Sequence, residues 1–172
     1  QFKLAGTPFG AEPGVTMRNA PCLRELQFCS QETAGNRIIT RFEYGHGLLF
    51  EHVAELHDGW LRIWTKVRNQ TTEPLVFEYL AGFSFDGISP FEPGSSAGKY
   101  FIERVNAQGH HEELSTENAG LEISGSLRFG QNSTMPVTRY YPFAGVEDRG
   151  QEVLWGVQLE ACGAWQLEVS RN

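Results

Sequence analysis

FEHVAELHDGWLRIWTKV, residues Phe50 to Val67, reads as two β-strands joined by a tight turn. Asp-Gly is the preferred pair for a two-residue loop of type I′, in which both positions need positive φ. If Asp58 and Gly59 form the loop, counting outward from His57 and Trp60 sets the register of the whole hairpin. The sequence therefore predicts an antiparallel hairpin over residues 50–67.

This register separates apolar from charged side chains. One face collects Phe50, Ala54, Leu56, Leu61, Ile63 and Val67, with His52 opposite Thr65. The other collects two cross-strand pairs of opposite charge, Glu51 with Lys66 and Glu55 with Arg62, and between them Val53 and Trp64. Because a slip of one residue would bury the charges, the register is strongly specified. We expect the apolar face to lie in the core and His52 to make a hydrogen bond there.

The rest of the chain also has the pattern of β-structure. Apolar residues alternate with polar ones over 121–129, 153–159 and 165–169, which is typical of half-buried antiparallel strands. Residues 75–85 are almost continuously apolar, which predicts a strand buried on both sides. By the same alternation, we expect Trp155 and Trp165 to pack in the core. The sequence predicts an all-β antiparallel sandwich, with residues 1–172 as a single domain.

Composition excludes several classes of function. The net charge of −7 disfavours nucleic acid as a partner, since binding to phosphates needs clustered Lys and Arg. No apolar run is long enough for a membrane span, and the start QFKLAGTPFG lacks the pattern of a signal peptide. Cys22, Cys29 and Cys162 are an odd number without metal-ligand spacing. We therefore expect reduced thiols in a cytoplasmic protein.

The last third of the chain carries a family resemblance. It contains PVTRYYPF at 136–143, WGVQL at 155–159 and WQLE at 165–168. These motifs resemble the segment that closes the N-terminal β-domain of the family 36 glycoside hydrolases, chiefly α-galactosidases. The resemblance implies a β-supersandwich of the kind found in galactose mutarotases. It also implies a catalytic (β/α)8 barrel C-terminal to residue 172, which would carry out retaining hydrolysis of α-galactosides without a cofactor.

The same resemblance implies that this chain is an accessory domain without catalytic residues of its own. The family's two catalytic aspartates lie in the barrel, whereas Asp58, Asp86 and Asp148 here all have turn signatures. The expected partners are the barrel of the same polypeptide, its galactoside substrate, and further copies in a homo-oligomer. The residues that we expect at such an interface are Trp64, Tyr140, Tyr141 and Phe143.

Two other interpretations are open at this point. A mutarotase-like epimerase would use a histidine and a glutamate for proton transfer, with His46, His52, His57, His110 and His111 as the candidates. A carbohydrate-binding module would stack sugars on exposed Trp or Tyr rings. A metal site at His110 and His111 is disfavoured, because neighbouring side chains in a strand point to opposite faces. We expect no metal or other cofactor.

Overall fold

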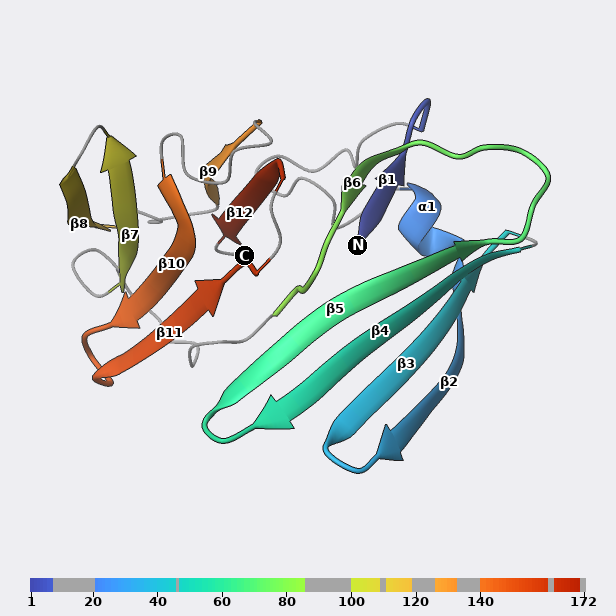
Figure 1. Cartoon of the computed structure of the whole chain (residues 1–172), viewed down its shortest axis with the longest axis horizontal. Helices are drawn as coiled ribbons and strands as arrows, with labels where there is room; N and C mark the ends of the chain where they lie inside the picture. Colours follow the sequence, from blue (N-terminus) through green and yellow to red (C-terminus); the bar gives the residue numbers. More distant parts are fainter. Residues whose placement is uncertain are drawn as a thin grey trace. The chain divides into compact units, whose positions relative to one another are not determined.

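The computed structural model describes residues 1–7, 21–45, 47–85, 100–108, 111–118, 126–132, 140–160 and 163–170 (Figure 1). These residues form antiparallel β-strands and one four-residue helix, so the prediction of an all-β antiparallel fold is confirmed. The chain divides into two compact units, Gln1–Ile88 and Ser89–Asn172. The single domain and the supersandwich arrangement stay predictions.

The first unit is built on a four-stranded sheet. Its order is β2-β3-β4-β5, and its strands are Leu26–Ala34, Arg37–Tyr44, Leu48–His57 and Trp60–Asn69. The register of β4 and β5 matches the predicted hairpin pair by pair, from Phe50 opposite Val67 to His57 opposite Trp60. The turn differs in one respect: only Gly59, with φ of 82°, takes the left-handed conformation, whereas a type I′ loop would need it at Asp58 as well.

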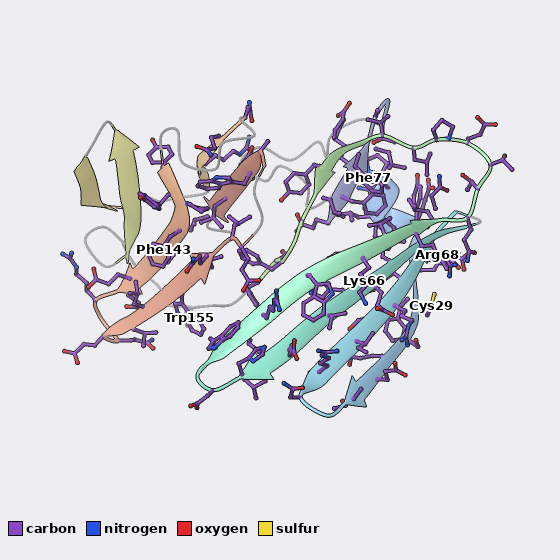
Figure 2. The ribbon with its side chains drawn as sticks, viewed as in Figure 1. Cys29, Lys66, Arg68, Phe77, Phe143 and Trp155 are labelled. Atoms are coloured by element: carbon purple, nitrogen blue, oxygen red, sulfur yellow. The ribbon has the colours of Figure 1, made fainter. Side chains whose placement is uncertain are left out.

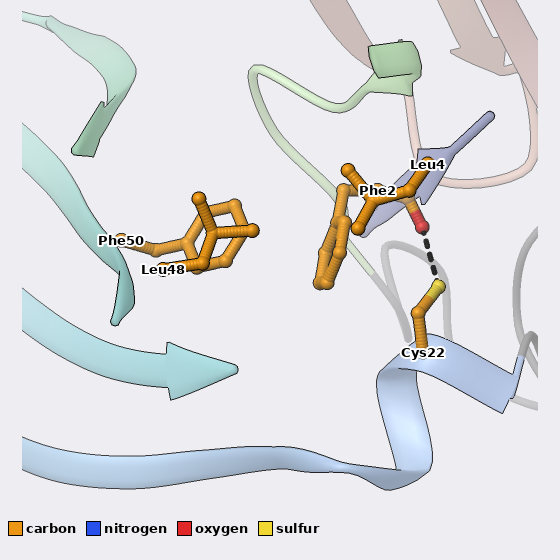
Figure 3. Packing of buried hydrophobic residues seen from close by; sticks show 5 residues of the cluster. All are labelled: Phe2, Leu4, Cys22, Leu48 and Phe50. Atoms are coloured by element: carbon orange, nitrogen blue, oxygen red, sulfur yellow. Dashed lines mark hydrogen bonds between the residues drawn. The ribbon is translucent and has the colours of Figure 1, made fainter. Parts of the chain in front are cut away.

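A small sheet and a helix cover one end of this sheet. Strand β1 (Phe2–Leu4) pairs with β6 (Phe77–Leu80), and helix α1 (Pro21–Arg24) begins at a proline, as first helical turns often do. Phe2 is 2% exposed, and its ring lies 4.6 Å from the ring of Phe50. Figure 3 shows Phe2 facing Phe50 and Leu48, with the Cys22 thiol donating to the Phe2 carbonyl oxygen at 3.0 Å. These contacts form the core of the first unit.

The apolar face of the sheet is buried at that end only. Leu48 and Phe50 are 2% and 5% exposed, whereas Leu56 and Leu61, beside the hairpin turn, are 58% and 51% exposed. Ile38, paired with Ala54, is 47% exposed. The expectation that this whole face lies in the core is therefore wrong for its turn end. We call Ile38, Leu56 and Leu61 the bare end.

Residues 75–85 also differ from the prediction. Only Phe77–Leu80 form a strand, β6, and its side chains alternate between half-buried and exposed. Leu75, Val76 and Phe85 are exposed. A continuous apolar run predicted a strand buried on both sides, but β6 is paired with the three-residue β1 and buries one side on the core.

The described residues of the second unit form two sheets. Their orders are β11-β10-β7-β8 and β12-β9, with strands β7 (Tyr100–Gln108), β8 (His111–Asn118), β9 (Ser126–Gln131), β10 (Tyr140–Asp148), β11 (Val153–Gln158) and β12 (Trp165–Ser170). Tyr140 and Ala144 of β10 pack with Trp165 of β12 in one buried cluster. Burial of Trp165 is thus confirmed, whereas Trp155 is 48% exposed and its predicted burial is wrong.

Proline and glycine fix two local features of this unit. The register of β10 on β7 shifts between Tyr140 and Ala144, around Pro142, which has no N–H to donate to the ladder. Gly130 of β9 lies where an added Cβ would overlap the Trp165 carbonyl oxygen and stand 2.8 Å from the Gln166 Cα. Only glycine allows the two backbones to approach so closely.

Candidate functional site

The second face of the β2–β5 sheet carries charged and aromatic side chains, and we call it the charged face. The register places on it Glu32, Arg37, Ile39, Arg41, Glu51, Val53, Glu55, His57, Trp60, Arg62, Trp64, Lys66 and Arg68. Figure 2 labels Lys66 and Arg68 along β5. Acidic and basic groups alternate from strand to strand, so the face is a ladder of ion pairs.

Glu51 and Arg41 form the centre of the ladder. Arg41 binds Glu32 at 2.8 Å and Glu51 at 3.2 Å, and Lys66 binds the other oxygen of Glu51 at 3.1 Å. The hydrogen bond from Lys66, reinforced by Arg41, lowers the pKa of Glu51. Hydrogen bonding to Glu32 raises the pKa of Arg41. Ion pairs this exposed contribute little each, about 0–1 kcal/mol, but they favour a single arrangement of the face.

Glu55 is the most enclosed carboxylate of the charged face, at 8% exposure. Arg37 of β3 donates to its Oε1 at 3.0 Å, and His57 Nε2 lies 3.5 Å from its Oε2. The hydrogen bond from Arg37 lowers the pKa of Glu55, so that the carboxyl stays ionised. The sequence predicted burial of the opposite face and missed this group, because a partner on β3 could not be read from the β4–β5 hairpin.

Trp64 lies beneath two guanidinium groups. The Cζ atoms of Arg37 and Arg62 are 5.8 and 5.9 Å from the centre of its ring, within the range of cation–π attraction. Its cross-strand partner Val53 is 2% exposed. The hairpin register placed this ring between charged side chains, and the structure covers it with two arginines of the same face. Its role at an interface stays a prediction.

Trp60 stacks flat against His57 at the turn end of this face. The ring centres are 4.1 Å apart and the planes differ by 9°. Trp60 is 50% exposed, and among the described residues His57 Nε2 has no hydrogen-bond partner. The sequence placed His57 beside the turn and opposite Trp60, and it missed the stack, although this pairing was the available signal.

Of the other candidate histidines, His52 does not join this group. His52 lies on the apolar face, where its Nδ1 is 3.0 Å from Thr65 Oγ1, so the predicted structural hydrogen bond is confirmed. Burial lowers the pKa of His52. His46 and His110 lie outside the described residues, and His111 begins β8. Within the described part of the chain, no three potential ligands gather into a metal site.

The three interface candidates of the second unit lie on β10. Tyr140 is 8% exposed and belongs to the buried cluster with Trp165, while Tyr141 and Phe143 are half-buried. Figure 2 labels Phe143 on β10. Its ring lies against Gly156 of β11, where an added Cβ would meet it at 3.5 Å. Tyr140 therefore has little surface left for a partner, and the interface role of all three stays a prediction.

The described aspartates are turn residues, as predicted. Asp58 occupies the β4–β5 loop, and Asp148 Oδ1 accepts hydrogen bonds from the backbone of Gly150 and Gln151 at 2.9 and 3.2 Å. Cys22 is buried and Cys29 exposed, and neither forms a disulfide. Asp86 and Cys162 lie outside the described residues. No helix in the described residues could cross a membrane.

Comparison of the chain with protein-family models, with curated proteins and with solved structures finds no match.

Proposed function

We propose that this chain is the N-terminal accessory β-domain of a cytoplasmic α-galactosidase of the family 36 type, whose catalytic barrel follows in the same polypeptide. The domain packs against the barrel and supports contacts between copies, and the barrel performs retaining hydrolysis. The motifs at 136–143, 155–159 and 165–168 support this parentage. The supersandwich arrangement belongs to the same proposal.

The observation that carries the accessory role is the bare end of the β2–β5 sheet. Three large aliphatic side chains lie together on one face, each about half exposed, directly beyond a well-covered core. Exposed apolar groups that gather in this way mark surfaces that bind a partner. A barrel domain joined to the same chain would cover them without the entropy loss of bringing two separate molecules together.

The carboxylates of the charged face also favour a scaffold over a hydrolase. A retaining glycosidase needs one carboxylate as nucleophile and a second as a proton donor, about 5–5.5 Å away. Glu51 and Glu55 are each held by two basic groups. Their lowered pKa values keep them ionised, which does not suit a proton donor. The basic groups bound to their oxygens make them poor nucleophiles.

The mutarotase-like alternative has one observation in its favour, the closeness of Glu55 and His57. Such an enzyme needs its acid and base on either side of a sugar, whereas here the two groups lie 3.5 Å apart, with Arg37 bound to the same carboxylate. No substrate atom fits between them in this arrangement. The scaffold interpretation therefore accounts better for this pair.

Two assays test the proposal. The 172-residue chain and a polypeptide extended by the sequence that follows it in the gene are compared for hydrolysis of p-nitrophenyl α-galactoside and for interconversion of galactose anomers. We expect hydrolysis by the extended protein only. Turnover of either substrate by the 172-residue chain, abolished in Glu55→Gln or His57→Gln, would overturn the accessory role.

The bare end has its own test. Leu56→Lys with Leu61→Lys should weaken association between domains or copies, measured by light scattering and by protease resistance of the extended protein. The matched control is Val153→Lys with Leu154→Lys, which alters two exposed apolar residues of the second unit. If the two double variants weaken association equally, the bare end is not a specific contact surface.

A further inference from the structure

We propose that the charged face binds a neutral oligosaccharide along β5, with Trp60 as the main contact. Half of the Trp60 surface is exposed, although a tryptophan normally buries most of its area. The ring is nevertheless held in place, because the imidazole of His57 lies parallel to it at 4.1 Å. An exposed aromatic ring with a fixed orientation is a platform that a ligand can use at little entropic cost.

A chain of contacts extends from this platform. His57 lies 3.5 Å from Glu55, and Glu55 accepts a hydrogen bond from Arg37. The Arg37 side chain is 49% exposed, and a guanidinium has five N–H donors, of which this bond uses one. Polar groups of fixed geometry therefore stand beside the aromatic platform.

The spacing along β5 sets the length of the ligand. Trp60 and Trp64 point to the same side of the strand and are four residues apart, a distance of about 13 Å. Arg62 lies between them on the same face. This distance exceeds one sugar ring, so we infer a ligand of several linked units that extends from Trp60 towards Trp64.

The chemistry of the face selects the class of ligand. The apolar C–H face of a pyranose stacks on an indole ring, whose faces carry the negative part of the quadrupole. Its hydroxyl groups can accept from guanidinium N–H groups and donate to carboxylates. Beside the platform, Arg37, Arg41 and Lys66 are paired with glutamates and Arg62 lies over the Trp64 ring, so the positive charge there is largely engaged within the face. An uncharged oligosaccharide fits this balance.

This site lies on the opposite face of the sheet from the bare end, and its argument does not rest on the proposed function. Binding is measured by isothermal titration and by tryptophan fluorescence on the full chain. The probes are galacto-, manno-, xylo-, cello- and malto-oligosaccharides of two to six units at up to about 10 mM, where millimolar affinity is still visible. We expect saturable binding of at least one series, tighter for longer members.

The matched variants are Trp60→Ala and Trp155→Ala, which remove two tryptophans of nearly equal exposure from different units. Trp60→Ala should weaken binding at least about tenfold, Trp155→Ala less than about twofold, and Trp60→Phe should recover part of the loss. Far-UV circular dichroism confirms that each variant is folded. Because a neutral ligand is bound, about 0.5 M NaCl should leave the affinity unchanged.

Three results would overturn the proposal. The first is absence of binding for every series in the wild-type chain. The second is an equal loss in Trp60→Ala and Trp155→Ala, which would indicate unspecific stacking on exposed rings. The third is binding of an acidic glycan only, lost in high salt, which would indicate attraction by charge in place of the proposed platform.

Discussion

The two ends of strand β4 have the same kind of sequence and different surroundings. Leu48 and Leu56 lie on the same face of the same strand, yet one is 2% and the other 58% exposed. The difference comes from β1, β6 and α1, which cover the first end. Alternation therefore tells which residues share a face, while burial depends on segments that lie far away in the sequence.

The largest expected effect is a direct test of this comparison. Leu48→Ala should destabilise the first unit by about 2–5 kcal/mol, because it removes a buried side chain and leaves a cavity. Leu56→Ala should change the free energy of unfolding by no more than about 0.5 kcal/mol. Urea unfolding followed by circular dichroism measures both. A large loss in Leu56→Ala would mean that the bare end is covered in solution.

The second prediction extends the comparison to the second unit. Gly130→Ala should destabilise it by about 1–3 kcal/mol, because the new methyl group would collide with the backbone of Trp165 and Gln166. Gly82→Ala is the control, since a Cβ there would meet nothing within 4 Å. Thermal unfolding compares the two variants. Similar melting temperatures would show that β9 and β12 can separate without loss of the fold.

The third prediction concerns acid stability of the charged face. The folded state lowers the pKa values of Glu51 and Glu55, so it binds their protons more weakly than the unfolded chain does. Their stabilisation is therefore present above the ordinary carboxyl pKa of 4.5 and is lost as the pH falls through the lowered values. Glu51→Gln and Glu55→Gln should flatten the pH profile of stability in this acid range. Profiles parallel to that of the wild type would contradict the ion-pair ladder.

The smallest expected effect comes from His52. Burial lowers its pKa, so the folded state resists protonation, and stability should begin to decline as the pH falls below the ordinary histidine value of 6.5. In His52→Gln this shallow first step should disappear, while the steeper carboxylate step remains. Urea midpoints between pH 7.5 and 5.5, about one unit on either side of that value, would detect it. If the step is unchanged in His52→Gln, protonation of another histidine causes it.

The hairpin shows how much of the fold could be predicted. Asp58-Gly59 and the alternating charges set every pair from Phe50–Val67 to His57–Trp60 correctly, because turn chemistry and face polarity act within one short segment. The four-residue β6 and the exposed Trp155 were not foreseen, because both depend on how much neighbouring structure covers an apolar run. The pattern of apolar residues within one segment does not show which distant segments will cover it.

The charged face was predicted in composition and not in detail. The sequence placed Glu55 and Trp64 on this face through their pairing across the hairpin. It could not show that Arg37, from the preceding strand, would bind Glu55 and lie over the Trp64 ring. That contact requires the β3–β4 register, and Gly45 and Gly47 mark a turn between these strands without specifying which residues pair.

Strand β2 contains a feature with a consequence for solubility. Among the described strands it is an outer one of its sheet, and an outer strand can pair through its backbone groups with the same strand of another molecule. Its register breaks between Phe28 and Ser30, and such a bulge bends the strand and disturbs the regular ladder that pairing needs. Deleting Cys29 should therefore remove the bulge and straighten β2. Copies of the protein could then pair through this strand and form fibrils.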